Sequence, residues 1–89
     1  MAAPKKDDTK ARFEAAAAAA MQTKKKPDNA TLLKLYAFYK QATQGDADGE
    51  RPPFSDFVGR AKFDAWEAVR GLSTDAARQG YVELVDALR

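Results

Sequence analysis

The chain has 89 residues, of which 15 are Lys or Arg and 13 are Asp or Glu, and it contains neither cysteine nor histidine. This length fits one domain with a single hydrophobic core. The missing residue types exclude disulfides, thiolate nucleophiles, Ser-His-Asp triads and the usual zinc sites. The formal net charge of +2 is too small to indicate a nucleic-acid-binding protein.

The first eight residues are polar and charged, with one proline. They offer little surface to bury, so we expect 1–8 to form a flexible N-terminal tail, order to begin near Thr9, and 9–89 to form the one domain. Lysines stand before and after the alanine run that follows, and no strongly apolar stretch lies between them. This pattern argues against a signal peptide or a membrane-spanning helix.

Residues 11–22 include six consecutive alanines, the strongest helix former, and predict a first helix. Its apolar face would carry Phe13, Ala17, Ala20 and Met21. The lysines at 24–26 suit the negative end of the helix dipole, and Pro27 blocks continuation of the helix.

A second helix is predicted to start at the capping residue Asp28 and to stop at Gly45. Apolar and aromatic residues recur in it at three- and four-residue spacing and would form its buried stripe: Leu32, Leu35, Tyr36, Tyr39 and Thr43. The stretch 46–55 contains Gly49 and the Pro52-Pro53 pair, which predict a long connection.

Two more helices are expected after this connection. The third would bury Phe57, Ala61, Ala65, Val69 and Leu72 and end at Gly71. The fourth would be capped by Ser73, with Asp75 near its N-terminus. Its buried face would carry Ala77, Tyr81, Leu84, Val85 and Leu88. Because no segment alternates with period two, we predict an all-α fold in which four helices pack their stripes together.

Two pairs of side chains lie four residues apart and so share a helical face: Tyr36 with Lys40, and Lys62 with Trp66. A phenol beside an ammonium can hold a phosphorylated aromatic ligand, with the ring against a base and the cation against phosphate. The alternative is that the rings belong to the core and the lysines are solvated cations. The carboxylates Asp64 and Glu67 indicate a solvated face rather than an acid–base pair.

The run LYAFYKQATQGD at 35–46 is followed by RPP at 51–53 and GRAKFDAW at 59–66. Together with Gly71, Ser73, Ala77 and Tyr81, this pattern resembles the acyl-CoA-binding protein family, from Phe13 onward. The resemblance implies a compact up-down-down-up four-helix bundle whose bowl-shaped face receives the ligand. It also implies that Tyr36 meets the adenine, that Lys40 and Lys62 meet the 3′-phosphate and neighbouring groups, and that Tyr81 completes the site.

The full set of ligand-binding residues expected from the resemblance is Ala17, Leu33, Tyr36, Ala37, Phe38, Tyr39, Lys40, Lys62 and Tyr81. Neither catalytic residues nor a metal site nor a cofactor is expected. An acyl-CoA has an anionic head and an apolar tail, whose exposure to water costs about 0.8 kcal/mol per methylene. A chain of this size can shelter such a tail in a groove between helices rather than in a large closed cavity.

The function implied is a cytoplasmic, monomeric, non-catalytic carrier of medium- to long-chain acyl-CoA esters, which serves intracellular transport and pool formation. Transient contact with acyl-CoA-using enzymes fits this role, whereas nucleic-acid binding and stable membrane insertion do not. The runner-up is a helical interaction module that docks a partner through the alanine-rich helix and a basic patch. Nonspecific nucleic-acid binding through 24–26 and an enzymatic role are weaker alternatives.

Three positions depart from the family pattern. Met21 and Val58 stand where lysines are common, and Phe63 stands where tryptophan is common. Two potential phosphate partners are therefore absent. Three alternatives follow: the remaining cations suffice, Lys24 or Arg60 substitutes, or affinity is lower and acyl contacts count for more. We expect Met21 to lie at the rim of the groove with Phe13 and Ala17, the alternative being that it faces the core.

Overall fold

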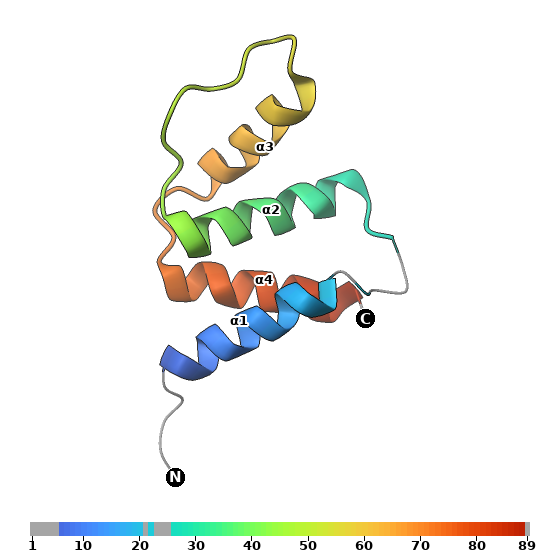
Figure 1. Ribbon diagram of the computed structural model, residues 1–89, viewed down its shortest axis with the longest axis vertical. Helices are drawn as coiled ribbons and strands as arrows, with labels where there is room; N and C mark the ends of the chain where they lie inside the picture. Colours follow the sequence, from blue (N-terminus) through green and yellow to red (C-terminus); the bar gives the residue numbers. More distant parts are fainter. Residues whose placement is uncertain (1–5, 21, 23–25, 89) are drawn as a thin grey trace.

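A computed structural model of the chain describes residues 6–20, 22 and 26–88, which form four α-helices and no strand. The helices are α1 (Lys6–Ala20), α2 (Asn29–Gln44), α3 (Phe57–Ala68) and α4 (Thr74–Leu88). Helices α1 and α4 run one way, whereas α2 and α3 run the other way (Figure 1). The predicted all-α fold and its up-down-down-up topology are confirmed.

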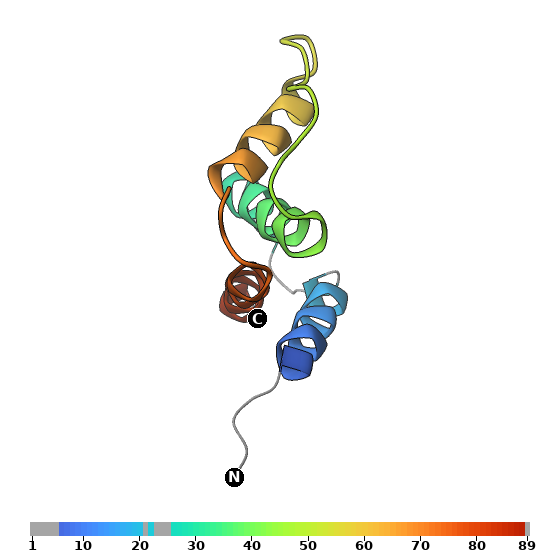
Figure 2. The same ribbon diagram turned by 90° about the vertical axis from the view of Figure 1, so that its left-hand side faces the viewer.

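The helices do not lie in space in their chain order. Helix α4 contacts α1 and α2, and α2 contacts α3 on its other side. Figure 2 shows α1 and α4 side by side, with α2 next to them and α3 farthest from α1. Helix α2 is therefore covered on two sides, and α3 is held mainly through α2.

Helix α1 begins at Lys6, before the predicted helix of residues 11–22 and before Thr9, where order was expected to begin. Residues 6–8 are therefore helical rather than part of a loose tail, which corrects the predicted boundary. The alanine-rich sequence favours propagation of the helix, and Asp8 places a negative charge near the positive end of the dipole. Residues 1–5 and Met21 lie outside the described residues.

The predicted ends of α2 and the predicted start of α4 are confirmed. The Asp28 carboxylate accepts a hydrogen bond of 2.8 Å from the backbone N–H of Thr31. Gly45 ends α2 at φ 83°, in the left-handed region that glycine adopts without strain. The Ser73 hydroxyl accepts a 3.0 Å bond from the N–H of Ala76 at the start of α4.

Helix α3 ends earlier than predicted. It is capped by Asp56, whose carboxylate accepts a 3.0 Å hydrogen bond from the N–H of Gly59, and it ends at Ala68. Gly71, the predicted end, lies in the following turn at φ 92°. Leu72 is consequently outside the helix and 37% exposed.

The core lies where α1, α2 and α4 meet. Its buried members are Phe13, Ala16, Leu35, Ala42, Ala77, Tyr81 and Val85. The stripe predicted for α4 is confirmed, since three of its members are in this cluster and Leu84 and Leu88 are half-buried against it. Ala77 and Val85 are 0% exposed and Tyr81 is 7% exposed, so the spacing in the sequence identified the buried face of α4 correctly.

The stripe predicted for α2 is partly wrong. Leu32 and Tyr39 are each 43% exposed, and Thr43 is exposed as well. The buried residues of α2 are instead Leu35, Ala37, Gln41 and Ala42. They occupy more than one helical face because α2 packs against α4 on one side and α3 on the other.

The stripe predicted for α3 is partly wrong too. Phe57 is 74% exposed, and the buried residue of α3 is Trp66, which the predicted stripe omitted. Ala61, Ala65 and Val69 are half-buried. Because α3 packs on α2 alone among the helices, a narrow contact face is enough to hold it.

The connection between α2 and α3 is held in place by polar side chains. The Gln41 side chain is 2% exposed, and its amide nitrogen donates to the Asp46 carboxylate at 2.8 Å and to the Leu72 carbonyl at 3.0 Å. The N–H of Gly71 donates to the same Asp46 oxygen at 2.8 Å. One carboxylate and one amide thus join the end of α2 to the turn between α3 and α4.

We predict that Asp46→Ala lowers the melting temperature and weakens the acid dependence of stability. The N–H of Gly71, followed by the Gln41 amide, lowers the pKa of Asp46 below its ordinary value. A lowered folded-state pKa contributes stability that is fully present above the ordinary pKa of about 4 and is lost as pH falls through the folded value. Thermal melts between pH 5 and pH 2 measure this loss.

The matched control is Glu50→Ala, which removes an exposed carboxylate from the same connection. The control should leave the neutral-pH melting temperature close to that of the wild type. An Asp46→Ala variant that melts like the control at every pH contradicts the proposed role of Asp46.

Candidate ligand-binding site

Helices α2 and α3 each carry a lysine whose ammonium lies over an aromatic ring of the other helix. We call these four residues, Tyr36, Lys40, Lys62 and Trp66, the seam. The ammonium of Lys62, from α3, lies 5.4 Å from the ring centroid of Tyr36 on α2. The ammonium of Lys40, from α2, lies 4.7 Å from the ring centroid of Trp66 on α3. Each helix therefore places a cation over an aromatic ring of the other, and the predicted trio of Tyr36, Lys40 and Lys62 is brought together.

Trp66 is buried under the Lys40 ammonium and is held by a hydrogen bond. It is 7% exposed, and its indole N–H donates a 2.7 Å hydrogen bond to the carbonyl of Gly45 at the end of α2. The ring under Lys40 is thus fixed to the same helix that carries the lysine. Trp66 is therefore a buried core residue, as one of the two alternatives predicted, and its ring lies under Lys40.

The carboxylates near this seam are paired with arginines. Asp64 accepts two hydrogen bonds from Arg51, at 2.7 and 2.8 Å, and Glu67 accepts two from Arg70, at 2.7 and 2.9 Å. These bonds lower the pKa of both carboxyl groups. Asp64 and Glu67 stay ionised and exposed, so they are unsuited to general acid or base chemistry.

A second aromatic group joins α1, α2 and α4. The Phe13 ring lies 5.6 Å from that of Tyr39 and 5.1 Å from that of Tyr81, centroid to centroid. Burial raises the pKa of Tyr81, and the neighbouring Tyr39 adds to the effect. The Tyr81 phenol therefore stays protonated at neutral pH and can donate a hydrogen bond.

An apolar groove opens between the N-terminal ends of α2 and α3. It has a volume of about 370 Å³ and is lined by Asn29, Leu32, Leu33, Phe57, Val58, Ala61 and Lys62. Lys62 belongs both to this groove and to the contact with Tyr36. The groove is thus continuous with the seam of lysines and rings, and we call it the seam groove.

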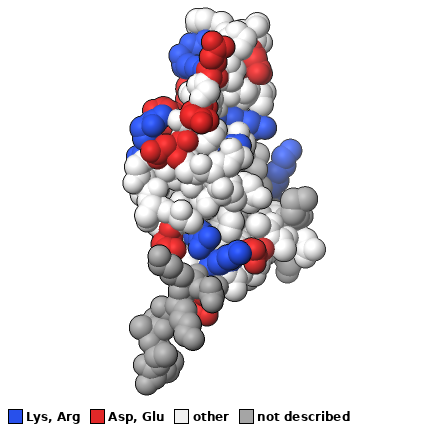
Figure 3. All heavy atoms as spheres, turned by 60° about the vertical axis from the view of Figure 1, so that its left-hand side comes forward, with Lys and Arg blue, Asp and Glu red and all other residues white. Residues whose placement is uncertain are grey.

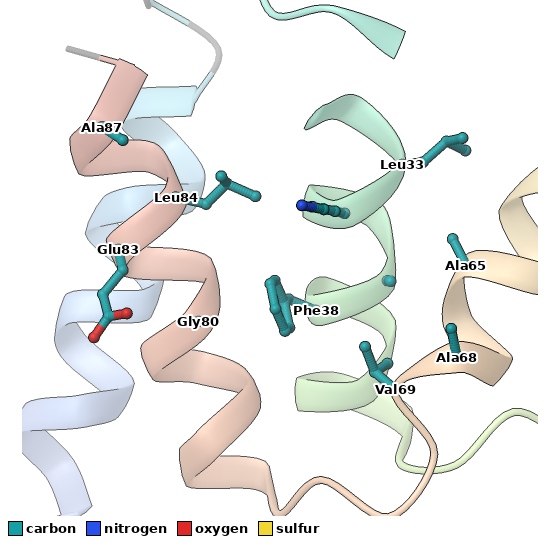
Figure 4. Close-up of a pocket in the computed structure, with 11 residues that line it drawn as sticks. Leu33, Phe38, Ala65, Ala68, Val69, Gly80, Glu83, Leu84 and Ala87 are labelled. Atoms are coloured by element: carbon teal, nitrogen blue, oxygen red, sulfur yellow. The ribbon is translucent and has the colours of Figure 1, made fainter. Parts of the chain in front are cut away.

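A larger groove of about 520 Å³ lies between α2, α3 and α4, and we call it the back groove. Figure 4 shows Phe38 pointing from α2 toward α4, with Ala65, Ala68 and Val69 along the α3 side. Phe38 packs at the α4 glycine Gly80, where an added Cβ would lie 2.9 Å from its ring. The back groove contains neither Lys40 nor Lys62.

The structure therefore divides the predicted site residues. Tyr36, Lys40 and Lys62 meet at the seam, Leu33 lines both grooves, and Tyr39 and Tyr81 form the second aromatic group. Ala17 is half-buried on α1 against the core. Ala37 and Phe38 line the back groove and are not brought to the seam, because neighbouring residues on a helix point in different directions.

Sequence reasoning missed several residues of the site. It paired Trp66 with Lys62 by helical spacing, whereas the cation over Trp66 is Lys40 from the other helix. It also placed Phe57 and Ala61 in the core, whereas both line the seam groove. Contacts between helices carry no signal in the spacing along one helix.

Charges of both signs adjoin one another on the face shown in Figure 3 rather than forming a basic stripe. No cluster of three or more potential metal ligands occurs among the described residues, and none of the helices is long and apolar enough to cross a membrane. The visible charge pattern gives no support to nonspecific nucleic-acid binding.

The acyl-CoA-binding protein family model matches residues 10–85, which is most of the chain. The chain belongs to this family. The match includes all four helices in part or whole and every residue of the seam and of the second aromatic group.

Several relatives are similar along most of their length. Acyl-CoA-binding protein homolog 1 of Caenorhabditis elegans is 45% identical over 76 residues, covering 85% of this chain and 88% of that protein. The crystal structure of acyl-CoA-binding protein 2 of Oryza sativa has a TM-score of 0.86 and 36% identity, covering 90% of this chain and 87% of that one.

The similarity to a longer protein is of a different kind. Human enoyl-CoA delta isomerase 2 is 51% identical over 65 residues, which is 73% of this chain. The chain spans only 16% of the length of that relative. A segment similar to this chain is thus one part of a much longer protein.

Proposed function

We propose that this chain is a non-catalytic carrier that binds medium- to long-chain acyl-CoA esters. We further propose that it acts in the cytoplasm as a monomer and serves intracellular transport and pool formation. The observation that carries this proposal is that Lys62 belongs to both the seam and the seam groove. Its ammonium lies over Tyr36 in the seam, while its side chain lines the apolar seam groove. An ester with a phosphorylated head and an apolar tail matches both halves.

The seam suits the nucleotide end of such a ligand. An ammonium over an aromatic ring gains about 0.5–1 kcal/mol at an exposed site and about 2 kcal/mol at a desolvated one, which does not exceed the roughly 1.5–3 kcal/mol of a hydrogen bond to a charged group. Lys40 and Lys62 are therefore held near their working positions by Trp66 and Tyr36 and can turn to a phosphate at small cost. The half-buried Tyr36 ring then offers a surface on which a base can stack.

The seam groove suits the acyl end. Apart from Asn29 and the Lys62 ammonium, its lining side chains are apolar, and its volume is within the range of small-molecule sites. The back groove is larger, yet it lacks both lysines, so a tail there would be separated from its head group. We therefore assign the acyl chain to the seam groove and not to the back groove.

The second aromatic group supports the α1 side of the proposed site. Tyr39 is 43% exposed and can contact a ligand directly, whereas Tyr81 is 7% exposed and can offer little beyond its phenol. Ala17, which is half-buried against the core on α1, completes this side. In this proposal Ala37 and Phe38 line the back groove and do not touch the ligand.

Two observations support a carrier rather than an enzyme. Asp64 and Glu67 are held by arginines, and the sequence contains no histidine or cysteine. The similarity to part of a protein named enoyl-CoA delta isomerase 2 supports transient contact between the carrier and acyl-CoA-using enzymes.

The deciding experiment is calorimetric titration of the full chain with palmitoyl-CoA, free CoA and free palmitate. We expect palmitoyl-CoA to bind far more tightly than either part alone, because only the whole ester fills both the seam and the groove. Equal affinity for palmitate and its ester would contradict the proposal. Failure to bind any acyl-CoA would favour the helical interaction module instead.

We predict that Lys40→Ala and Lys62→Ala each weaken palmitoyl-CoA binding by about 1.5–3 kcal/mol, the usual value for a hydrogen bond to a charged group. The affinity of each variant should also depend less on salt. The control is Lys34→Ala, because Lys34 is on the same helix as Lys40 but lines the back groove. Circular dichroism checks that helix content is unchanged.

The assignment of the acyl chain can be tested by filling either groove. Ala61 lines the seam groove and Ala68 lines the back groove, and both are on α3. We predict that Ala61→Phe weakens palmitoyl-CoA binding about tenfold, as expected when roughly two methylenes lose their shelter, and leaves CoA binding unchanged. Ala68→Phe should bind like the wild type. The reverse result would move the acyl chain to the back groove.

A further inference from the structure

Leu33, on α2, borders both grooves of the molecule. It lines the seam groove and the back groove, and no other described residue lines both. Figure 4 shows it pointing from α2 toward the side on which α3 carries Ala65, a residue of the back groove. Ala61, about one helical turn earlier on α3, lines the seam groove. The two grooves therefore adjoin, and their boundary is formed by one leucine and two alanines.

This boundary is one that a single side chain can open. Leu33 is half-buried and is not a member of the core cluster, so its side chain can exchange between staggered rotamers without displacing a helix. Ala61 and Ala65 are half-buried too, and they carry no atom beyond Cβ that could close the passage. When Leu33 turns aside, the apolar linings of the two grooves become one path.

The α3 side of the back groove is apolar beyond this boundary. Ala65, Ala68 and Val69 line it, as Figure 4 shows. The groove also has two charged lining residues, Lys34 and Glu83. Both are exposed, so their charges remain in water while their carbon stems add apolar surface. A saturated hydrocarbon tail matches such a lining, whereas a polar ligand would leave its hydrogen-bonding groups unpaired.

We propose that Leu33 is the length-determining residue of the carrier site. A palmitoyl chain stays in the seam groove, whereas the end of a longer saturated chain passes Leu33 and lies along the α3 side of the back groove. This role rests on the proposed carrier function and defines which acyl chains the site can take. Such a chain keeps its head group at the seam, because it reaches the back groove by way of the seam groove. It passes neither the buried Ala37 nor Phe38, which points toward α4.

The energetic reason is the fixed size of the seam groove. Its volume is about 370 Å³, near the lower end for small-molecule sites, so a growing chain must exceed it. Each methylene then left in water weakens binding about fourfold relative to a sheltered one. The back groove, with a volume of about 520 Å³, lies beyond the boundary and removes that loss.

The test is calorimetric titration of the full chain with palmitoyl-CoA and with lignoceroyl-CoA, whose saturated chain is longer, each below its micelle-forming concentration. We expect the wild type to bind lignoceroyl-CoA more tightly. Ala68→Phe should weaken lignoceroyl-CoA binding about tenfold, because roughly two methylenes lose their shelter, and should leave palmitoyl-CoA binding unchanged. Ala68 is exposed, so the added ring needs no space in the core. The control is Ala76→Phe, since Ala76 is exposed on α4 and lines neither groove.

A second variant acts on the boundary itself. Leu33→Ala should raise the ratio of lignoceroyl-CoA affinity to palmitoyl-CoA affinity about fourfold, as for one further sheltered methylene. The ratio is the quantity to compare because Leu33 also lines the seam groove, so its truncation lowers both affinities. Circular dichroism checks that the helix content of each variant is unchanged.

Three results would contradict the role of Leu33. They are a wild type that binds lignoceroyl-CoA no more tightly than palmitoyl-CoA, an Ala68→Phe variant that weakens both esters equally or neither, and a Leu33→Ala variant with an unchanged ratio. Each of these results leaves the carrier function standing as long as palmitoyl-CoA binds. A wild type that binds no acyl-CoA overturns the carrier function and the role of Leu33 together.

Discussion

The buried side-chain amide of Gln41 joins the C-terminal end of α2 to the connection that follows it and to the turn between α3 and α4. Its nitrogen donates to the connection after α2 and to the turn after α3, and Asp46 accepts a further bond from that turn. The indole of Trp66 bonds to Gly45 one turn away. These contacts converge on the C-terminal end of α2, so the angle between α2 and α3 is set there. The lysines and rings of the seam are aligned because this end is fixed.

Three of the arginines and the two lysines of the seam have different partners. Arg51, Arg70 and Arg78 form ion pairs with carboxylates, and their planar guanidinium groups suit such paired contacts. Lys40 and Lys62 lie over aromatic rings instead. A ring attracts an ammonium without neutralising it, so the two lysines keep their charge for an anionic ligand. The small net charge of the chain thus conceals a local separation between the arginines in ion pairs and the two lysines of the proposed site.

The sequence predicted the parts of the fold that depend on neighbouring residues. Asp28, Gly45 and Ser73 were predicted as helix boundaries because capping is a local effect. The buried face of α4 was predicted because its apolar residues recur at three- and four-residue spacing. Gln41 was missed, and the partners of Trp66 were not predicted, since both depend on residues far along the chain. Tyr36, Lys40 and Lys62 were placed by resemblance, and their crossed contacts between helices could be seen only in the structure.

The attachment of α1 has a thermodynamic consequence. The backbone of α1 lies close to that of α4 and of no other helix, and its side-chain contact with α2 includes the Phe13 ring, which packs on Tyr39 as well as on Tyr81 of α4. A helix held on one side is expected to open locally more often than helices held on two. Undocking of α1 would remove Phe13 from the two tyrosines of the proposed site. A ligand that requires these tyrosines in place would therefore stabilise the docked state of α1 by mass action, and slower amide exchange along α1 would accompany binding.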